Sequence, residues 1–343
     1  MKRVMVVTNS LTGGGAERSM NLMCNELTRR NWTVSLVPIN DSPADKVTPS
    51  CEIFALKRDW KSGIKSTLRA FFAFNRAVKT WKPDLIILNC DLPELFGAML
   101  VKKQNFVVIE HASNPWGSRV PLGKLVRKIL KIKKAQWAAV SSHLTIWPGK
   151  WKPDVFLSNP LVPTSRRDLQ FQPLKRLVFV GRLSPEKRPN DAIRIAKESK
   201  HNLVVIGDGL LRAELEDKVS REALDVYFLG RLEDPWVELK SGDLLLVPSA
   251  FEGDGLVVIE ALQRGIPILI SDIPDFRRFG FSETNYCVGV EGFVRKIEFF
   301  RNDLTQLVVP KDVSDLIVTP RSIEVVGDLW IAFLEGRILS GES

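Results

Sequence analysis

Two glutamates separated by seven residues mark the part of the sequence most suited to ligand chemistry. Glu252 and Glu260 lie in the run PSAFEGDGLVVIEA, which begins at Pro248 and passes from a glycine-rich turn into an apolar helical stretch. A carboxylate on an apolar helix is costly to bury unless it accepts hydrogen bonds, and the two hydroxyl groups of a ribose would supply them to Glu260. Glu252 precedes the turn and is suited to accept hydrogen bonds from sugar hydroxyls. The alternative is a capping loop with one solvated and one salt-bridged glutamate.

The turn between these glutamates is suited to bind phosphate. Gly253 and Gly255 let the backbone approach a ligand closely, and the following helix is expected to begin near Leu256. A helix N-terminus offers N–H groups without partners in the helix and the positive end of the helix dipole, both of which favour an anion. The turn therefore predicts an anion site.

Two cations lie five residues apart after an earlier apolar run. Arg182 and Lys187 belong to the loop GRLSPEKRP, which begins at Gly181 and leads into a helix expected from Asn190. A guanidinium and an ammonium that converge on one pocket would neutralise a diphosphate leaving group without a metal ion. The alternative is a pair of solvated loop cations.

A further glycine-rich loop follows the first apolar run of the chain. Residues 12–18 read TGGGAER, in which Gly14 and Gly15 would let the backbone approach a phosphate or a polar sugar at the start of a helix. The nearest rival is the dinucleotide fingerprint G-x-G-x-x-G, whose third glycine would fall on Arg18. The other alternative is a tight turn without a ligand.

The elements that must position these loops alternate between short apolar runs and helical stretches, which is the βαβ pattern of doubly wound parallel sheets. Ligands of such sheets bind beyond the carboxyl ends of the strands, where these loops fall, and two facing sheets would form one deep cleft. The expected strands are Arg3–Thr8, Thr33–Pro38, Leu85–Asn89, Phe106–Glu110, Trp137–Ser141, Leu177–Gly181, Leu203–Gly207, Val226–Gly230, Leu244–Pro248 and Pro267–Ser271. The expected helices are Glu17–Arg30, Lys65–Lys82, Leu92–Lys103, Lys124–Lys134, Asn190–Ser199, Leu210–Ala223, Leu256–Arg264 and Ser322–Gly336.

The length of 343 residues predicts two domains. The segment Ser158–Pro173 contains three prolines and no apolar periodicity, so we interpret it as the linker. The predicted domains are residues 1–165 and 166–321, followed by a C-terminal helix in residues 322–343. Two placements of this helix remain open, against the C-terminal domain or back on the N-terminal domain.

The composition excludes several classes of protein. Hydrophobic residues make up 45% and charged residues 26% of the chain, as in ordinary globular proteins. Cys24, Cys51, Cys90 and Cys287 form no CxxC pair, which excludes a zinc ribbon or disulfide scaffold and indicates a reducing compartment. Three histidines without carboxylate clusters predict no metal site. The first apolar run, Val4–Val7, is too short for a signal peptide or a membrane span, so we expect a cytoplasmic protein.

Three of these motifs, in this order and at this spacing, resemble the retaining glycosyltransferases with the GT-B fold, of the group 1 or family four type. They are GGAER from Gly14, GRLSPEK from Gly181 and PSxxEGxGLxxxEA from Pro248. The resemblance covers about residues 4–30 and 177–275. It implies an α/β protein with two facing Rossmann-like domains, parallel sheets and an interdomain cleft.

The resemblance also implies roles for individual residues. Arg182 and Lys187 match the family's diphosphate clamp, Glu260 matches the carboxylate that binds the ribose, and Glu252 matches the first glutamate of the pair that holds the donor sugar. His111, at the end of the fourth expected strand, matches a position that faces the donor sugar, although a lone histidine is more often structural. The implied catalytic residues are thus Glu252, Arg182, Lys187 and His111. The other implied donor contacts are Gly14, Gly15, Gly230, Arg231, Leu232, Gly253, Asp254, Gly255, Leu256 and Val257, of which residues 230–232 would read the nucleobase.

The implied activity is transfer of a hexose or N-acetylhexosamine, with retention, from a nucleotide diphosphate sugar to a bacterial cell-envelope glycan or a lipid-linked acceptor. UDP is the expected nucleotide, and neither a metal nor another cofactor is implied. One alternative is a GT-B-fold nucleotide-sugar epimerase or hydrolase. Another is a non-catalytic glycan- or nucleotide-binding subunit, against which the intact charged residues of the motifs argue. The chain departs from the family at Asp254, where many relatives have an apolar residue, and in residues 284–319, where no element is predicted.

The charge of the chain is unevenly distributed. Residues 1–170 carry 27 Lys and Arg against 12 Asp and Glu, whereas residues 171–343 carry 22 against 28. The stretch Lys57–Lys82 has eight cations, one acid and five aromatic residues, including Trp60, and Lys124–Lys134 is a basic stretch with apolar residues at 125, 126, 129, 130 and 132.

Two interpretations of these basic stretches remain. They are either an interfacial surface for an anionic membrane and a lipid-linked acceptor, or two ordinary helices with the apolar face on the sheet and the basic face in water. Binding to nucleic acid is not expected, because no recognition motif accompanies the charge. The first interpretation would place the protein at the inner face of the cytoplasmic membrane.

Overall fold

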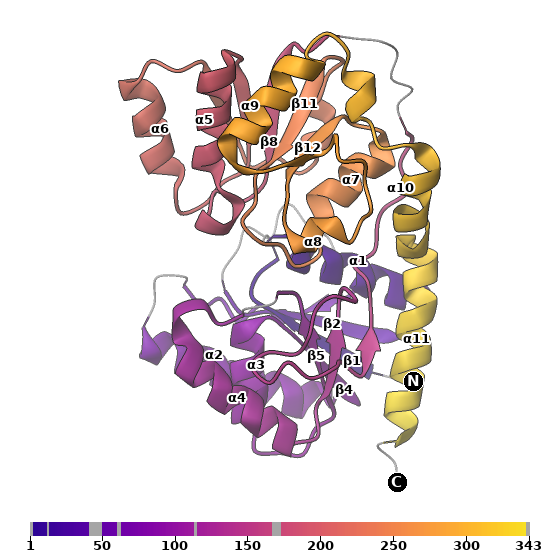
Figure 1. The fold of residues 1–343 in the computed structure, drawn as a ribbon. Helices are drawn as coiled ribbons and strands as arrows, with labels where there is room; N and C mark the ends of the chain where they lie inside the picture. Colours follow the sequence, from indigo (N-terminus) through magenta and orange to yellow (C-terminus); the bar gives the residue numbers. More distant parts are fainter. Residues whose placement is uncertain are drawn as a thin grey trace. The chain divides into compact units, whose positions relative to one another are not determined.

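The computed structural model describes residues 3–11, 14–40, 50–59, 63–112, 115–166 and 173–340. Contacts within the chain divide it into an N-terminal unit, Met1–Val162 with Arg321–Ser343, and a C-terminal unit, Pro163–Pro320. Each unit contains one parallel sheet with flanking helices (Figure 1). The predicted α/β fold built on two parallel sheets is confirmed, and the unit boundaries lie within a few residues of those expected.

The sheet of the N-terminal unit is seven-stranded, in the order β3-β2-β1-β4-β5-β6-β7. Five of these strands begin and end within two residues of the expected positions. The short strands β3 and β7 were not predicted, because two residues are too few to show an apolar periodicity. The strands are β1 (Arg3–Thr8), β2 (Thr33–Pro38), β3 (Glu52–Ile53), β4 (Leu85–Asn89), β5 (Phe106–Glu110), β6 (Gln136–Ala139) and β7 (Val155–Phe156).

Alternate residues of these strands face two different helical layers. On β1, Val4 and Val6 pack beneath α1 and α11, whereas Met5 and Val7 pack against α2, α3 and α4. Figure 1 shows α2, α3 and α4 together on one face of the sheet. The helices are α1 (Gly15–Arg29), α2 (Ile64–Trp81), α3 (Asp91–Met99), α4 (Val120–Ile132) and α11 (Ile323–Ser340), with the 3-10 turn η2 (Gly117–Arg119) before α4.

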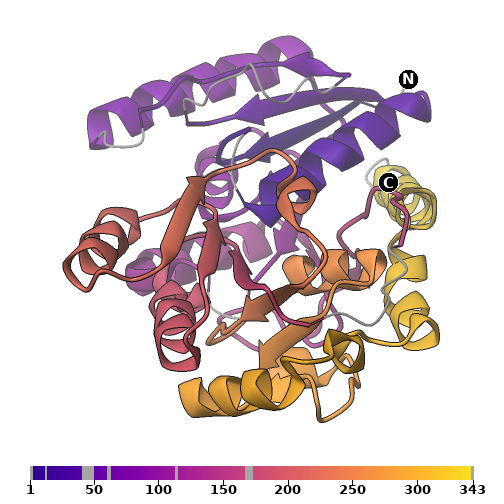
Figure 2. The ribbon, with the colours of Figure 1, turned by 90° about the horizontal axis from the view of Figure 1, so that it is seen from above.

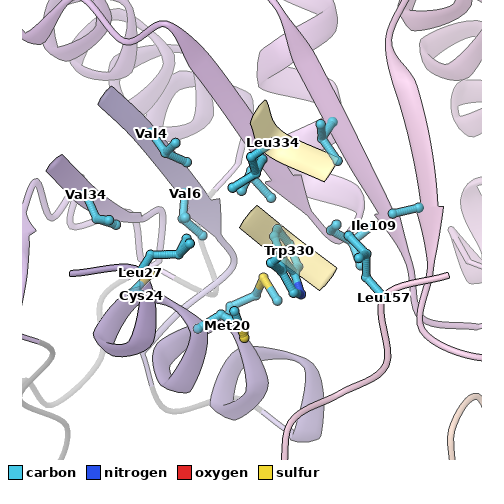
Figure 3. Close-up of a cluster of buried hydrophobic side chains, with 14 of the residues drawn as sticks. Val4, Val6, Met20, Cys24, Leu27, Val34, Ile109, Leu157, Trp330 and Leu334 are labelled. Carbon is cyan, nitrogen blue, oxygen red and sulfur yellow. The ribbon is translucent and has the colours of Figure 1, made fainter. Parts of the chain in front are cut away.

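The C-terminal helix α11 is part of the N-terminal core. Trp330 and Leu334 are buried in the same apolar cluster as Met20 and Leu27 of α1 (Figure 3). Arg30, just after α1, donates a hydrogen bond of 2.9 Å to the carbonyl oxygen of Glu324. Figures 1 and 2 show α11, in yellow, beside α1, in indigo.

The sheet of the C-terminal unit is six-stranded, in the order β10-β9-β8-β11-β12-β13. Its strands are β8 (Arg176–Val180), β9 (Leu203–Ile206), β10 (Val226–Gly230), β11 (Asp243–Val247), β12 (Ile268–Ser271) and β13 (Tyr286–Cys287). Its helices are α5 (Pro189–Ser199), α6 (Arg212–Arg221), α7 (Leu256–Arg264), α8 (Pro274–Arg277), α9 (Gly289–Phe300) and α10 (Lys311–Val318). Residues 284–319, for which no element was predicted, thus contain β13, α9 and α10.

The predicted linker Ser158–Pro173 contains the point where the chain passes from one unit to the other, between Val162 and Pro163. The Leu161 N–H donates to the Arg321 carbonyl at 2.7 Å, which fixes this part of the chain in the N-terminal unit. The Arg166 guanidinium donates to Ser314 Oγ at 2.8 Å and to the carbonyl of Val309 at 2.7 Å, both within the C-terminal unit. Residues 167–172 of the predicted linker lie outside the described residues. Specific hydrogen bonds thus order a segment whose sequence has no periodicity.

Candidate active site

The loops that follow β8 and β11 are neighbours, because these strands pair in parallel and their carboxyl ends share one edge of the sheet. The Ala250 N–H donates to the Glu186 carbonyl at 2.8 Å, which fixes one loop on the other. Lys187, at the end of the 3-10 turn η3 (Pro185–Lys187), places its Nζ 2.5 Å from Glu252 Oε2. The tertiary structure therefore brings together two charged groups that belong to separate sequence motifs.

Both carboxylate oxygens of Glu252 have protein partners. Ser249 Oγ donates to Oε1 at 2.8 Å, whereas Lys187 donates to the other oxygen, Oε2. The Glu252 backbone N–H donates to Asp275 Oδ2 at 2.8 Å. Glu252 is therefore the salt-bridged glutamate of the alternative interpretation. A carboxylate has about four acceptor positions, so these two partners leave room for a sugar hydroxyl.

Helix α7 begins at a position that requires glycine. Gly255 has φ of 68°, and a Cβ there would lie only 3.2 Å from Cε1 of Phe276. Gly253 is half-buried, as are Leu256 and Val257 in the first turn of α7. N–H groups in the first turn have no acceptor within their own helix. The predicted phosphate-binding turn is thus present as a tight entry into a helix N-terminus.

Asp254 fixes this turn instead of presenting an exposed carboxylate. It is buried, and Arg278 Nη2 donates to its carbonyl oxygen at 2.6 Å and to Oδ1 at 3.3 Å. Arg278 Nε also donates to the Asp275 carbonyl at 2.8 Å. One guanidinium therefore connects the turn after β11 with the segment after β12.

Glu260 has a protein partner that the sequence analysis did not predict. Its Oε2 accepts a hydrogen bond of 2.7 Å from Trp236 Nε1, and the Arg264 guanidinium lies 5.1 Å from the centroid of the Trp236 ring. Trp236 lies in the 3-10 turn η4 (Pro235–Glu238), between β10 and β11. The indole thus meets part of the hydrogen-bonding need that the sequence assigned to a ribose.

The other predicted donor contacts lie at the same edge of the C-terminal sheet. Arg182 is exposed, and within the described part of the chain its guanidinium forms no hydrogen bond or ion pair. The loop after β9 closely approaches the loop of Arg182: Gly207 has φ of 148°, and a Cβ there would lie 1.8 Å from the Gly181 carbonyl oxygen. Gly230 accepts the Gly207 N–H at 2.8 Å, Arg231 is exposed and Leu232 is half-buried.

The glycine-rich loop of the N-terminal unit leads directly into α1. Gly14 donates its N–H to Glu17 Oε2 at 2.7 Å, and Gly15, the first residue of α1, is exposed. Thr12 and Gly13 lie outside the described residues. This hydrogen bond is half of a capping box, so Glu17 stabilises the start of the helix that the loop precedes.

His111 is held by residues at the ends of two neighbouring strands. Its Nε2 lies 2.5 Å from Oδ1 of the buried Asn89, the last residue of β4. Asn89 Nδ2 in turn donates to Thr8 Oγ1 of β1 at 3.4 Å. Because an amide oxygen only accepts hydrogen bonds, Nε2 of His111 carries a hydrogen in this arrangement.

A buried ion triad supports the strand that precedes His111. Arg127 of α4 donates to Glu94 of α3 at 2.6 Å and 2.8 Å, and to Glu110 of β5 at 2.5 Å. Burial raises the pKa of Glu94 to about 7, although the positive charge of Arg127 opposes this rise. The expectation that the cations of residues 124–134 all lie on a basic face is therefore wrong for Arg127, which is buried. Helical spacing places it on the side of α4 that meets the two carboxylates.

Several residues that contact the predicted site belong to none of the motifs. Trp236, Asn89 and Arg278 each act through a side chain whose partner is distant in sequence, so no local spacing identifies them. Gly207 and Gly209 follow β9 as a Gly-Asp-Gly turn, and this pattern could have identified the loop from the sequence.

The four cysteines are free thiols. In the described ranges, no three His, Cys, Asp or Glu side chains gather in a group that could hold a metal ion. None of the helices formed by those residues has the length and apolar character needed to cross a bilayer.

Residues 163–280 match the sequence profile of the family described as Glycosyl transferases group 1. The chain is 26% identical to a Campylobacter jejuni enzyme over 76% of this chain and 77% of the relative. That relative is named GalNAc-alpha-(1->4)-GalNAc-alpha-(1->3)-diNAcBac-PP-undecaprenol alpha-1,4-N-acetyl-D-galactosaminyltransferase. An uncharacterized Haemophilus influenzae glycosyltransferase is 25% identical over 97% of this chain and 100% of its own.

A solved structure shows the same fold. HepE from Anabaena, crystallised with UDP and glucose, superposes with a TM-score of 0.75 at 17% identity, over 98% of this chain and 100% of HepE. The two parallel sheets, the family match and these similarities agree with one another. Residues 163–280 thus match the group 1 glycosyltransferases, and the chain has the GT-B fold.

Proposed function

We propose that this protein transfers a hexose or N-acetylhexosamine, with retention, from a UDP-sugar to a bacterial cell-envelope glycan or a lipid-linked acceptor. The observation that carries the proposal is the Lys187–Glu252 pair, 2.5 Å apart, in the loops after β8 and β11. Ligands of open parallel sheets bind at this edge, and the N-terminus of α7 lies in the same loop as Glu252.

In the proposed reaction, the bond between the sugar C1 and the diphosphate oxygen breaks. The acceptor hydroxyl oxygen bonds to C1 on the same face, and its proton passes to the departing phosphate oxygen. UDP leaves with a growing negative charge, which fixed positive groups must stabilise. We assign this task to Lys187, Arg182 and the first N–H groups of α7, without a metal ion.

The remaining predicted residues have supporting roles in this proposal. Glu252 orients Lys187 and accepts a hydrogen bond from the donor sugar, while Glu260 accepts from the ribose hydroxyls. His111 contacts a sugar hydroxyl, with its ring oriented by Asn89. The turn formed by Gly230, Arg231 and Leu232 meets the nucleobase through its backbone, and Gly14 and Gly15 approach the donor.

Two relatives support the choice of donor and acceptor. HepE was crystallised with UDP, which favours UDP as the nucleotide here. The name of the Campylobacter enzyme describes an acceptor on undecaprenyl diphosphate, which favours a lipid-linked glycan. The transferred sugar of that enzyme is an N-acetylhexosamine, within the class proposed.

Thermal unfolding with UDP, GDP, ADP and TDP, each with and without EDTA, tests the donor site. A ligand that binds only the folded state raises Tm, by an amount that grows with its affinity. We expect UDP to give the largest rise, and the rise to persist in EDTA. If none of the four nucleotides raised Tm, this result would contradict the donor site and favour a non-catalytic subunit. Turnover of the UDP-sugar without any acceptor would favour an epimerase or hydrolase.

A further inference from the structure

Helix α2 carries apolar side chains on two different sides. Phe74 and its neighbours on one side are buried against the sheet. Ile64, Leu68 and Phe72, spaced four residues apart, form a second row that is 80%, 41% and 65% exposed. A helix that only covers a sheet needs the first row alone, so the second row is not required for packing on the sheet.

Helix α4 repeats this arrangement. Val126 and Leu130 are buried against the sheet, whereas Leu122, Leu125 and Ile132 are 37%, 56% and 73% exposed. The expectation that the apolar residues of this stretch share one sheet-facing side is therefore wrong, because a period of 3.6 residues separates them into two rows. The interpretation of α2 and α4 as ordinary sheet-covering helices does not account for their outer rows.

Every charged side chain exposed on these two helices is a cation. In α2 they are Lys65, Arg69, Arg76 and Lys79, and in α4 they are Lys124, Lys128 and Lys131. Neither helix contains an acid. The remaining cation of α4, Arg127, is buried and neutralised by two glutamates. The outward charge of both helices is thus uniformly positive.

The two helices belong to one continuous layer (Figure 1). Helix α3 contacts α2 through the edge-on rings of Phe96 and Phe71, and contacts α4 through Glu94 and Arg127. No residue of α3 is exposed, so α2 and α4 form the outer ridges of this layer. We call their exposed apolar rows, with the flanking cations, the α2–α4 face.

We infer that the α2–α4 face docks on an anionic lipid bilayer. Apolar side chains enter the boundary between headgroups and acyl chains, while flanking lysines and arginines meet the negative headgroups. A second copy of this face would bring like charges together, and nucleic acid would leave the apolar rows exposed to water. Membrane docking is inferred from the exposed apolar rows and the positive charge of the α2–α4 face. Only the purpose of docking, access to a lipid-linked acceptor, rests on the proposed function.

Flotation of the full chain with lipid vesicles tests this inference. We expect binding to vesicles of phosphatidylcholine and phosphatidylglycerol in equal parts, release at high salt, and no binding to phosphatidylcholine alone. The double variant Lys124→Gln/Lys128→Gln should lower the partition coefficient about 25-fold, since each lysine near an anionic surface contributes about fivefold. Phe72→Ser with Leu125→Ser should lower it at least about tenfold, through lost apolar insertion.

The matched control is Phe299→Ser with Lys311→Gln in the C-terminal unit, where Phe299 is 76% exposed on α9. We expect this control to bind vesicles as the unchanged protein does. The UDP-dependent rise in Tm, measured on the same variants, tests the donor site separately, so a failed donor site and a failed membrane surface give different results.

Four outcomes would overturn the inference. The first is no binding to anionic vesicles at low salt, and the second is an equal loss of binding in the control. The third is a dimer in sedimentation velocity that Phe72→Ser with Leu125→Ser dissociates, which would assign the face to a second copy. The fourth is salt-sensitive retention on DNA without vesicle binding, which would assign the cations to nucleic acid.

Discussion

Lys187 Nζ and Glu252 Oε2 lie 2.5 Å apart although 65 residues separate them in the sequence. The pair joins the loop after β8 to the loop after β11 and positions the ammonium beside the start of α7. An ammonium has three N–H groups, so Lys187 can keep Glu252 as a partner while it donates to a diphosphate. Glu252 thus holds the cation in place before the donor arrives.

Lys187→Ala should lower kcat/KM for the UDP-sugar by about 10²–10³-fold, because one preorganised donor to a developing negative charge is removed. Initial rates with the UDP-sugar and an acceptor measure this loss. The control is Arg194→Ala, which removes an exposed cation of α5 that pairs with Asp191 and Glu198 of its own helix. Unchanged turnover in a folded Lys187→Ala protein would contradict the diphosphate clamp.

Glu260→Gln should weaken UDP binding about tenfold, as expected for a hydrogen bond to a charged acceptor. Calorimetric titration with UDP and with 2′-deoxy-UDP tests the cause. The unchanged protein should prefer UDP, and Glu260→Gln should reduce this preference. An undiminished preference would show that another group binds the ribose.

Trp236→Phe should lower the free energy of unfolding by about 1–3 kcal/mol, because a buried carboxylate loses its 2.7 Å indole donor. Urea denaturation measures the change. Val237→Ala is the matched control, since this neighbour is exposed and should be nearly neutral. Equal losses in both variants would mean that the turn, and not the hydrogen bond, accounts for the effect.

Arg278→Ala should raise KM for the donor about tenfold, because the Asp254 turn loses the guanidinium that fixes it before α7. Asp254→Asn keeps the bond from Arg278 to the backbone carbonyl and should have a smaller effect. Arg277→Ala is the control, since Arg277 forms exposed ion pairs with Asp272 and Glu283, and such pairs contribute little. If Arg277→Ala raised KM equally, the turn would not depend specifically on Arg278.

Arg127→Met should lower the free energy of unfolding by about 3–5 kcal/mol at neutral pH, because Glu94 and Glu110 lose their buried counter-ion. The loss should shrink near pH 5, where the buried carboxyl groups of the variant bind protons. Thermal and urea unfolding across this range measure it. The exposed neighbour Lys128→Met is the control and should be nearly neutral at both pH values. A loss independent of pH would show that packing alone accounts for the effect.

The unchanged protein should show a related dependence on pH. Burial raises the pKa of Glu94 from its ordinary value to about 7. Between these two pH values, the folded state therefore binds more protons than the unfolded state. This glutamate's contribution to stability is therefore fully present at low pH and falls as pH rises toward 7. Glu94→Gln should flatten that part of the stability curve.

The sequence by itself determined most of the parallel strands and the positions of the motif loops. Apolar runs of four to six residues identify buried strands because the two helical layers leave them little contact with water. The loops after β1, β8 and β11 were correctly expected at strand ends, since a glycine-rich turn followed by an amphipathic helix is a local pattern. The family resemblance rests on these same loops.

Only the tertiary structure decided which side chains meet. Strand order places β8 beside β11, so Lys187 reaches Glu252, whereas the order along the chain puts β9 and β10 between those strands. The partners of Glu260 and Arg127 likewise come from other elements, Trp236 in η4 and the glutamates of α3 and β5. Periodicity reports which residues one helix or strand buries, but a buried polar group is satisfied by whichever element packs against it, and that choice depends on the assembled fold.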